Sequence, residues 1–391
     1  MTLLFSVACG LAVANVYYAQ PLLDAMATEF NIGHAVIGLV MTITQIGYGL
    51  GLLLVVPLGD LLDRRRLVVG QSLLTAIALI VVAFAPSAGI MLAGMAAVGL
   101  LTVVTQVLVA YAGILADPSQ RGRVVGVVTS GVIIGIVLAR TVSGTLADLF
   151  GWRSVYLVSA VATLGIAGLL FKSLPLQTNR GVQVSYLRLI GSVFTLFIEE
   201  PVLRVRAVLA LLIFAAVNVL WTPMVLPLSA PPFSLSHTEV GLFGLAGAMG
   251  AIGATSAGRL ADRGHAQRTT GIALAIMLVS WQPIALLSHS LWGLIAGVVM
   301  IDFGLQSVHV SNQSLILSVR PEARSRLTAG YMIFYSIGCG AGAITSTMAY
   351  AQAGWLGVCL LGSVISAAAL IFWALTRHVA RLAAIDPARR R

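Results

Sequence analysis

Two ionisable side chains, Arg140 and Asp302, lie within long apolar runs of the sequence. A charge at the centre of a membrane helix costs roughly 2.5–3.5 kcal/mol on insertion scales, so each needs a chemical reason to be there. At about 1.5 Å per residue, both lie roughly 24 Å from the basic end of their run, and we expect them at one depth. Asp302 could take up a proton, while Arg140 competes with that proton or binds an anionic group of a ligand. The alternatives are a fixed structural ion pair and a residue hydrated by a cavity.

A polar stripe accompanies Asp302. On a helix, Gln306 and His309 share its face at the i+4 and i+7 positions. Because imidazole titrates near neutral pH, a carboxylate and a histidine two turns apart could relay a proton. In the alternative interpretation, His309 is a hydrogen-bonded packing residue.

Amide and aromatic side chains recur beside prolines in the first and seventh apolar runs. A helix broken within a bilayer is tolerated where it lines a cavity, so these side chains are candidates for binding an amphiphilic organic molecule. The first set is Asn15, Tyr18, Gln20, Asn218 and Trp221. For Tyr18 and Trp221, an aromatic belt near the outer membrane surface is the favoured alternative. Weaker candidates for the same cavity are Gln45, Tyr48, Gln106, Gln306 and Tyr335.

The composition indicates which elements position these residues. Hydrophobic residues make up 59% of the 391 residues and charged ones 9%, against about 25% charged residues in a soluble domain. Continuous apolar runs long enough to cross a bilayer predict a multi-pass helical membrane protein and exclude a β-barrel. Glycine-rich segments at 47–51 and 338–342 are interpreted as close-packing surfaces. The twelve runs lie near 3–25, 35–57, 67–85, 88–114, 124–147, 152–171, 204–226, 238–257, 269–288, 291–318, 327–351 and 354–376.

Basic residues are distributed on one side of these spans. With the N-terminus inside, all but Arg140 and Arg153 of the 23 Lys and Arg residues fall in inner segments. This bias predicts a protein of the inner (plasma) membrane with both termini cytoplasmic, and explains the net charge of +10 without nucleic-acid binding. The three cysteines lie in apolar runs without metal-site spacing, and we expect no metal, no cofactor and a monomer among membrane lipids.

The longest polar stretch divides the chain into two halves. We expect an N-terminal six-helix bundle at 1–171, a cytoplasmic linker at 172–203, a C-terminal six-helix bundle at 204–376 and a basic cytoplasmic tail at 377–391. Within the linker, residues 184–198 are predicted to form an amphipathic helix on the membrane surface.

The two halves repeat each other at a displacement of 203 residues. Asn15 corresponds to Asn218, His34 to His237 and Gly151-Trp152 to Gly354-Trp355. Repeats inserted in the same orientation are related by an axis along the membrane normal and allow the halves to rock around a central site.

A second repeated motif follows the second and eighth spans. One copy includes Gly59, Asp63 and Arg64, and the other includes Gly258, Asp262 and Arg263. The glycines would let two spans approach closely, and each aspartate could cap a neighbouring helix N-terminus. The alternative is a turn that only sets the topology.

These loops resemble the signature loop of the major facilitator superfamily. The segment 15–23, Asn-Val-Tyr-Tyr-Ala-Gln-Pro-Leu-Leu, and Pro57-Leu-Gly-Asp60 are similar to its bacterial twelve-span, proton-coupled drug and sugar efflux branch. The resemblance implies two six-helix repeats, alternating access, and gating by the six loop residues just named. Arg66 stands where the pattern has its second Gly, and the fifth span lacks the Gly-Pro of the antiporter motif.

We therefore expect a secondary transporter that exports a small organic solute, such as a drug, sugar or metabolite, in exchange for protons. The alternatives within transport are a proton symporter and a facilitator for uptake. A membrane enzyme or sensor is disfavoured, because Asp302 is the one deep carboxylate and the longest segment outside the spans is short.

Overall fold

The computed structural model describes residues 1–117, 120–175, 185–320 and 323–385. These residues form helices joined by turns, with no strand among them. Parts of the predicted linker and of the predicted basic tail lie outside the described residues.

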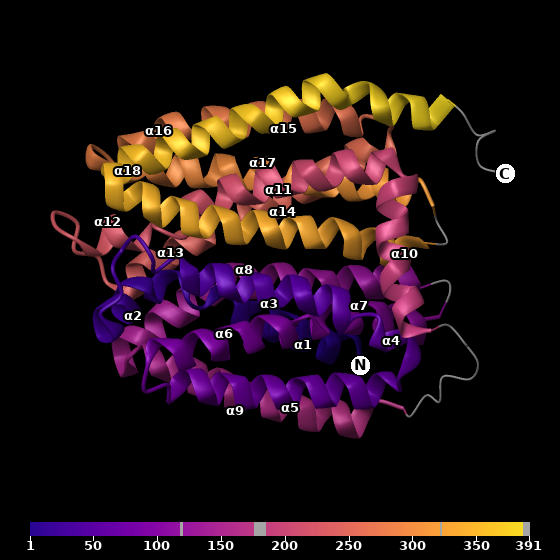
Figure 1. The fold of residues 1–391 in the computed structure, drawn as a ribbon, viewed down its shortest axis with the longest axis horizontal. Coiled ribbons are helices and arrows are strands. Elements are labelled where there is room, and N and C mark those ends of the chain that lie inside the picture. The colour runs from indigo at the N-terminus through magenta and orange to yellow at the C-terminus, as the bar shows by residue number, and fades with distance from the viewer. Residues whose placement is uncertain (118–119, 176–184, 321–322, 386–391) are drawn as a thin grey trace. The chain divides into compact units, whose positions relative to one another are not determined.

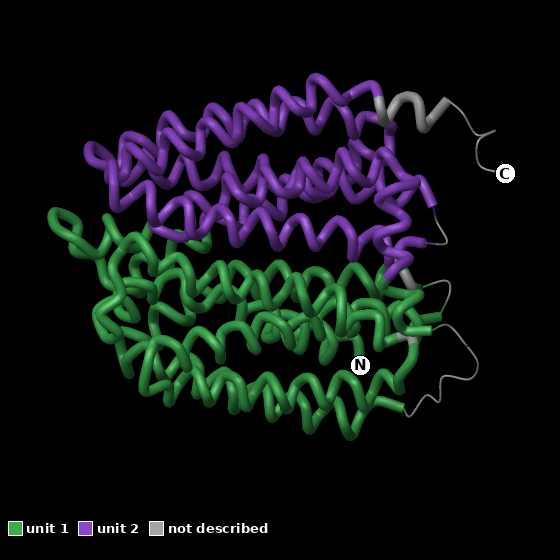
Figure 2. Tube along the Cα trace, viewed as in Figure 1, with its two compact units in different colours: residues 1–190, 224–245 green, residues 191–223, 246–391 purple. Residues whose placement is uncertain are grey.

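The chain forms two compact units (Figure 2). Unit 1 comprises Met1–Ile190 and Met224–Leu245, and unit 2 comprises Gly191–Pro223 and Ala246–Arg391. Residues 224–245 of unit 1 therefore come from the predicted C-terminal half. The predicted domain boundaries stay predictions.

Unit 1 is a bundle in which α1 packs on α8, α3 on α6 and α5 on α9 (Figure 1). Its elements are α1 (Thr2–Tyr17), η1 (Gln20–Leu22), α2 (Leu23–Phe30), α3 (Leu39–Leu54), α4 (Leu58–Leu61), α5 (Arg64–Ala83), α6 (Ala88–Thr102), α7 (Val104–Leu115), α8 (Arg121–Phe150), α9 (Trp152–Ser173), α12 (Val225–Ser229) and α13 (His237–Ala246).

Unit 2 is a second bundle, in which α11 packs on α18 and α17 packs on both α14 and α15. Its elements are α11 (Pro201–Trp221), α14 (Met249–Asp262), α15 (Ala266–Val279), α16 (Trp281–Ala285), η2 (Leu286–Ser288), α17 (Leu291–Leu317) and α18 (Arg324–Ile385).

Helix α10 (Tyr186–Glu199) covers most of the predicted amphipathic helix and continues from unit 1 into unit 2. Val193 and Leu196 are buried, whereas Leu187, Phe194 and Ile198 are exposed. Contact between this helix and lipid stays a prediction.

Ten helices in the described residues are long and apolar enough to cross a membrane, and α3 is a shorter apolar helix. The last of the ten, Arg326–His378, contains non-helical backbone at Ala353 and Gly354, where two predicted spans meet. Gly354 has a φ of +59°, which glycine adopts without steric cost. The arrangement is consistent with twelve spans and confirms the predicted all-α, multi-pass membrane fold.

Small residues allow these helices to approach closely. A Cβ atom on Gly47 or Gly51 would overlap the backbone of α6, and one on Gly338 or Gly342 would overlap the backbone of α11. Both glycine segments are therefore close-packing surfaces, as predicted, because backbone contact between membrane helices requires small side chains.

Candidate functional site

Arg140 lies in α8 of unit 1, and its side chain is almost fully buried. Its Nε donates a hydrogen bond of 2.7 Å to Oε1 of Gln20, and its guanidinium lies 5.5 Å from the ring centre of Tyr17. Because α1 ends at Tyr17 and the chain turns through η1 at Pro21, Gln20 is directed at α8. Two predicted site residues, Arg140 and Gln20, thus meet, and Tyr17 adds an aromatic face that binds cations.

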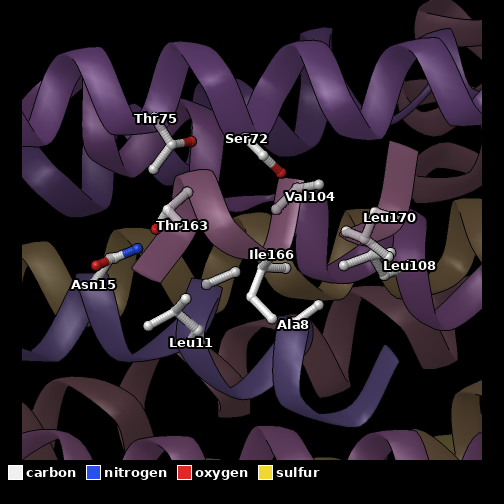
Figure 3. Close-up of a pocket in the computed structure, with 11 residues that line it drawn as sticks. Ala8, Leu11, Asn15, Ser72, Thr75, Val104, Leu108, Thr163, Ile166 and Leu170 are labelled. Atoms are coloured by element: carbon white, nitrogen blue, oxygen red, sulfur yellow. The ribbon is translucent and has the colours of Figure 1, made fainter. Parts of the chain in front are cut away.

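Asn15 lies in α1, two residues before Tyr17, and is fully buried. Its Oδ1 accepts a hydrogen bond of 2.6 Å from the hydroxyl of Ser159. The side chain also lines a small cavity with Ser72, Thr75 and Thr163 (Figure 3). This cavity has a volume of about 20 Å³, which suits one water molecule and is too small for an organic solute.

Tyr48 of α3 and Gln106 of α7 also come together. Nε2 of Gln106 donates a hydrogen bond of 3.3 Å to the hydroxyl of Tyr48. Gln45, one turn before Tyr48, is fully buried. These three predicted cavity residues therefore place polar side chains on α3 and α7 of unit 1.

Asp302 lies in α17 of unit 2 and is also nearly buried. The indole Nε1 of Trp221, at the end of α11, donates a hydrogen bond of 3.3 Å to its Oδ1. Gly250 of α14 packs against the backbone of Asp302 and the side chain of Gln306. The indole donor therefore holds one oxygen of the carboxylate in place.

Trp221 and Tyr18 are both buried within the protein. A lipid-facing aromatic belt, which the sequence favoured for these two residues, is therefore wrong. In the sequence, both rings lie close to a proline at the end of a span, and this pattern fits a buried ring and a lipid-facing ring equally well.

His309 takes part in a polar network of unit 2 rather than pairing with a carboxylate. Its Nδ1 lies 2.9 Å from the hydroxyl of Tyr331, and its Nε2 lies 3.3 Å from Nε2 of Gln313. An amide nitrogen only donates, so Nε2 of the imidazole accepts and Nδ1 carries the proton that Tyr331 accepts. The proton relay from Asp302 stays a prediction.

The network extends to a buried arginine that the sequence interpretation missed. Arg206 was counted among the inner basic residues, but it lies in α11 and is 1% exposed. Its Nη1 donates a hydrogen bond of 3.3 Å to Oδ1 of Asn312, which lies three positions after His309 on α17. The α11 helix begins at Pro201, so Arg206 lies in its second turn, close to the start of the run predicted at 204–226.

Aromatic rings cover the same network. Phe214 lies edge-on to His309, with ring centres 5.3 Å apart, and contacts Tyr335 at 4.2 Å. Asn218 donates to the backbone carbonyl of Phe214 at 3.0 Å, a bond within its own helix. The predicted residues His309 and Tyr335 therefore pack against one ring, that of Phe214, and Asn218 bonds the backbone of the same residue.

The two signature loops differ in structure. Asp63 caps α5, because its Oδ1 accepts a hydrogen bond of 2.8 Å from the backbone N–H of Arg66. Asp262 instead ends α14, and α15 begins four residues later behind His265. The predicted capping role is confirmed for Asp63 and wrong for Asp262, because extra residues, including Gly264 with a φ of +78°, separate Asp262 from the next helix.

The glycines of these loops are not sites of close approach. A Cβ on Gly59 would lie 3.6 Å from Val107, and one on Gly258 would lie 3.9 Å from Val310. Both distances are ordinary van der Waals contacts, so the expectation that these glycines bring two spans together is wrong. Arg64, at the start of α5, and Arg263, after α14, lie at the helix ends, and the gating role of the loops stays a prediction.

No group of three or more His, Cys, Asp and Glu side chains in the described parts of the chain is placed to hold a metal ion. Cys9, Cys339 and Cys359 are buried free thiols.

Comparison with known proteins identifies the family. Residues 4–281 and 207–390 match the model of the Major Facilitator Superfamily. "Uncharacterized transporter YgaY" of Escherichia coli O157:H7 is 46% identical over 373 residues, which are 95% of this chain and 94% of that protein. "Probable transporter SCO4007" of Streptomyces coelicolor is 31% identical over 392 residues, which are 99% of this chain and 87% of that protein.

A solved structure shares the fold. It is a bacterial homologue of the human lysosomal transporter Spinster in an inward-facing, unoccupied conformation, with a TM-score of 0.75, 14% identity and coverage of 99% of this chain and 98% of that one. Long apolar helices with a few charged side chains buried among them are typical of membrane transporters. This chain belongs to the Major Facilitator Superfamily and is a membrane transporter of that type.

Proposed function

We propose that this transporter exports a small organic solute across the inner membrane in exchange for protons, by alternating access. The observation that carries the proposal is Asp302, a nearly buried carboxylate held by Trp221 within an apolar helix. Such a carboxylate pays a desolvation cost when ionised, so a proton and a second ligand can compete for it.

Arg140 supports the proposal from unit 1. It is buried beside Gln20 and Tyr17, which offer an amide and a ring to an amphiphilic solute. An arginine in this setting binds an anionic group of the solute or competes with the proton of Asp302. The resemblance of residues 15–23 and 57–60 to the efflux branch supports export as the direction.

The test uses purified protein in proteoliposomes with an imposed pH gradient and a pH-sensitive dye inside. Nucleosides, sugars and amphiphilic drugs are added in turn, and proton flux and solute movement are followed together. Proton and solute movement in opposite directions is expected. Movement in one direction would favour the uptake alternative, and solute movement without proton flux would contradict proton coupling.

Asp302→Asn keeps the size of the side chain and removes its proton-binding oxygen. We expect at least a tenfold loss of gradient-driven transport, while Asp302→Glu retains part of it. Asp117→Asn, at an exposed acidic residue outside the helices, serves as the matched control. Full gradient-driven accumulation by Asp302→Asn would overturn the coupling role.

A further inference from the structure

His237, the first residue of α13, lies between two carboxylates from other helices of unit 1. Its Nδ1 is 2.9 Å from Oδ1 of Asp148 in α8, and its Nε2 is 3.1 Å from Oδ1 of Asp24 in α2. All three side chains are about one-quarter exposed, so water reaches them. No motif of the sequence interpretation included this cluster, although His237 was matched with His34 in the repeat.

The geometry defines the protonation state that satisfies the cluster. A neutral imidazole has one N–H, and ionised carboxylates only accept hydrogen bonds. With both ring nitrogens facing carboxylate oxygens, a neutral His237 would leave one nitrogen lone pair against a negative oxygen. The imidazolium donates to both, so this arrangement is that of the charged form.

Asp148 is held by the start of α13 as well as by the ring. The backbone N–H groups of His237 and Thr238 donate to its two oxygens at 3.1 Å and 2.7 Å. These N–H groups are among the unpaired donors at a helix N-terminus, which favours a negative charge there. The carboxylate therefore joins the end of α8 to the beginning of α13.

Other charged groups on the helices that carry the cluster have their own partners. On α13, Glu239 accepts a hydrogen bond of 2.8 Å from the backbone N–H of Ser236. On α2, Glu29 pairs with Arg153 of α9 at 2.6 Å. On α8, Arg140 packs its side chain against Gly244 and bonds Gln20. The positively charged ring of His237 therefore pairs with the carboxylates of Asp24 and Asp148.

Close backbone packing accompanies the charged cluster. A Cβ on Gly144 of α8 would overlap the carbonyl oxygen of His237, and one on Gly241 of α13 would overlap that of Arg140. The hydroxyl of Thr141 donates to the carbonyl of Gly241 at 3.0 Å. Residues 224–245, which belong to the C-terminal half in sequence, are attached to the N-terminal half by these contacts.

We propose that His237 is a proton-binding site whose imidazolium latches residues 224–245 onto α2 and α8, and that loss of its proton opens this latch. The topology predicted from the basic residues places the end of the first span, the end of the fifth and the start of the eighth at the outer surface. The proton therefore exchanges with the outer aqueous phase. The inference rests on the proposed function only in assigning the latch to one end of an alternating-access cycle.

Deprotonation changes the balance of charge at the latch. The neutral ring donates to one carboxylate and turns its lone pair to the other, while two negative charges remain close to each other. Acidic conditions therefore keep the latch closed, and alkaline conditions loosen it.

Hydrogen–deuterium exchange of the full chain in lipid nanodiscs tests this directly. Peptides spanning 236–245 are compared at about pH 5.5 and about pH 9.5, below and above the range in which imidazoles titrate, after correction for the intrinsic exchange rate. Protection of this segment is expected to fall by about tenfold or more at the higher pH, the size expected for loss of a charge-assisted hydrogen bond.

Three variants distinguish protection due to the charged latch from protection due to helix packing. His237→Gln should show low protection at both pH values, because it cannot donate to both carboxylates with a positive charge. His237→Arg should show high protection at both, because guanidinium stays charged and has several donors. His34→Gln, the exposed counterpart in the repeat, should behave as the wild type.

Equal protection of the wild type at the two pH values would overturn the proposal. So would a His237→Arg protein that follows the His237→Gln protein at low pH while the rest of the chain stays protected. Neither readout needs a solute or a proton gradient. A pH-dependent latch in a protein that moves no protons in proteoliposomes would contradict the proposed function alone.

Discussion

His237 lies between two carboxylates at the exposed end of a helix, whereas His309 lies between a phenol and an amide inside unit 2. In the first setting the charged ring satisfies both neighbours, and in the second the neutral ring donates once and accepts once. The same residue type is therefore part of a charged cluster in one region and of an uncharged polar network in the other. The charge state of each histidine depends on the partners that other helices supply, and not only on how deeply the ring is buried.

The two regions also differ in what holds them together. The His309 network ends at Arg206, a buried arginine that donates to Asn312 and has no acidic partner among the hydrogen bonds described for it. The His237 cluster combines opposite charges with close backbone contact between α8 and α13. The first region should thus respond to loss of a hydrogen-bond acceptor and the second to pH.

The largest expected effect is in the His309 region. Asn312→Leu removes the acceptor of Arg206 and leaves a buried guanidinium unsatisfied, so the free energy of unfolding should fall by about 2–3 kcal/mol. Denaturation in detergent micelles measures this change in the free energy of unfolding. Asn312→Asp keeps an acceptor and should cost less, and adding Arg206→Met to Asn312→Leu should recover part of the loss. Equal stability of Asn312→Leu and wild type would contradict this account.

The next effect concerns the packing of the His237 region. Gly144→Ala places a methyl group against the carbonyl of His237 and should lower the free energy of unfolding by about 1–3 kcal/mol. Deuterium exchange of 236–245 should be fast even at low pH. Gly168→Ala, on α9 where a Cβ meets no atom within 4 Å, is the control and should leave stability unchanged or slightly raised. An intact latch in Gly144→Ala would refute the packing argument.

A smaller difference separates the two carboxylates of His237. Asp148 also accepts two backbone N–H groups, whereas Asp24 meets the ring through one contact. At low pH, protection of 236–245 should therefore fall about tenfold in Asp148→Asn and about threefold in Asp24→Asn. The ratio between the two variants, measured by deuterium exchange side by side, checks the order. A larger loss for Asp24→Asn would reverse the assignment.

The smallest effect is expected from His309. His309→Gln should change the ratio of protection at the two pH values in 236–245 by less than about twofold, because its neighbours Tyr331 and Gln313 are uncharged. Deuterium exchange of residues 236–245 at the two pH values measures this ratio. A His309→Gln protein without the pH response would mean that the two histidines act together, which would remove the contrast between the regions.

Much of the fold could be predicted from the sequence because its cause is local. Apolar runs of bilayer length predict membrane helices wherever they occur, and the Asp63 cap depends on residues three positions apart. The glycines at 47–51 and 338–342 were found by composition alone. Asp262 shows the limit of this reasoning, since the same motif followed by a longer turn ends one helix instead of capping the next.

The candidate site could be predicted only in part. Arg140 and Asp302 were found because a charge in an apolar run is rare and costly. Arg206 was missed because it lies near the end of its run, where a span and a loop look alike in sequence. The partners Gln20 and Trp221 were among the candidates, but nothing in the sequence assigned Gln20 to Arg140 or Trp221 to Asp302.

By itself, the sequence determined that this protein is a helical membrane protein with repeated halves and a small number of charges within its spans, because hydrophobicity and charge act through residue type and spacing. Only the tertiary structure decided that His237 meets Asp24 and Asp148, residues 213 and 89 positions away, while His309 meets Tyr331 and Gln313. The protonation state of a side chain depends on which groups lie within a few ångströms. Helix packing, not chain order, brings those groups together.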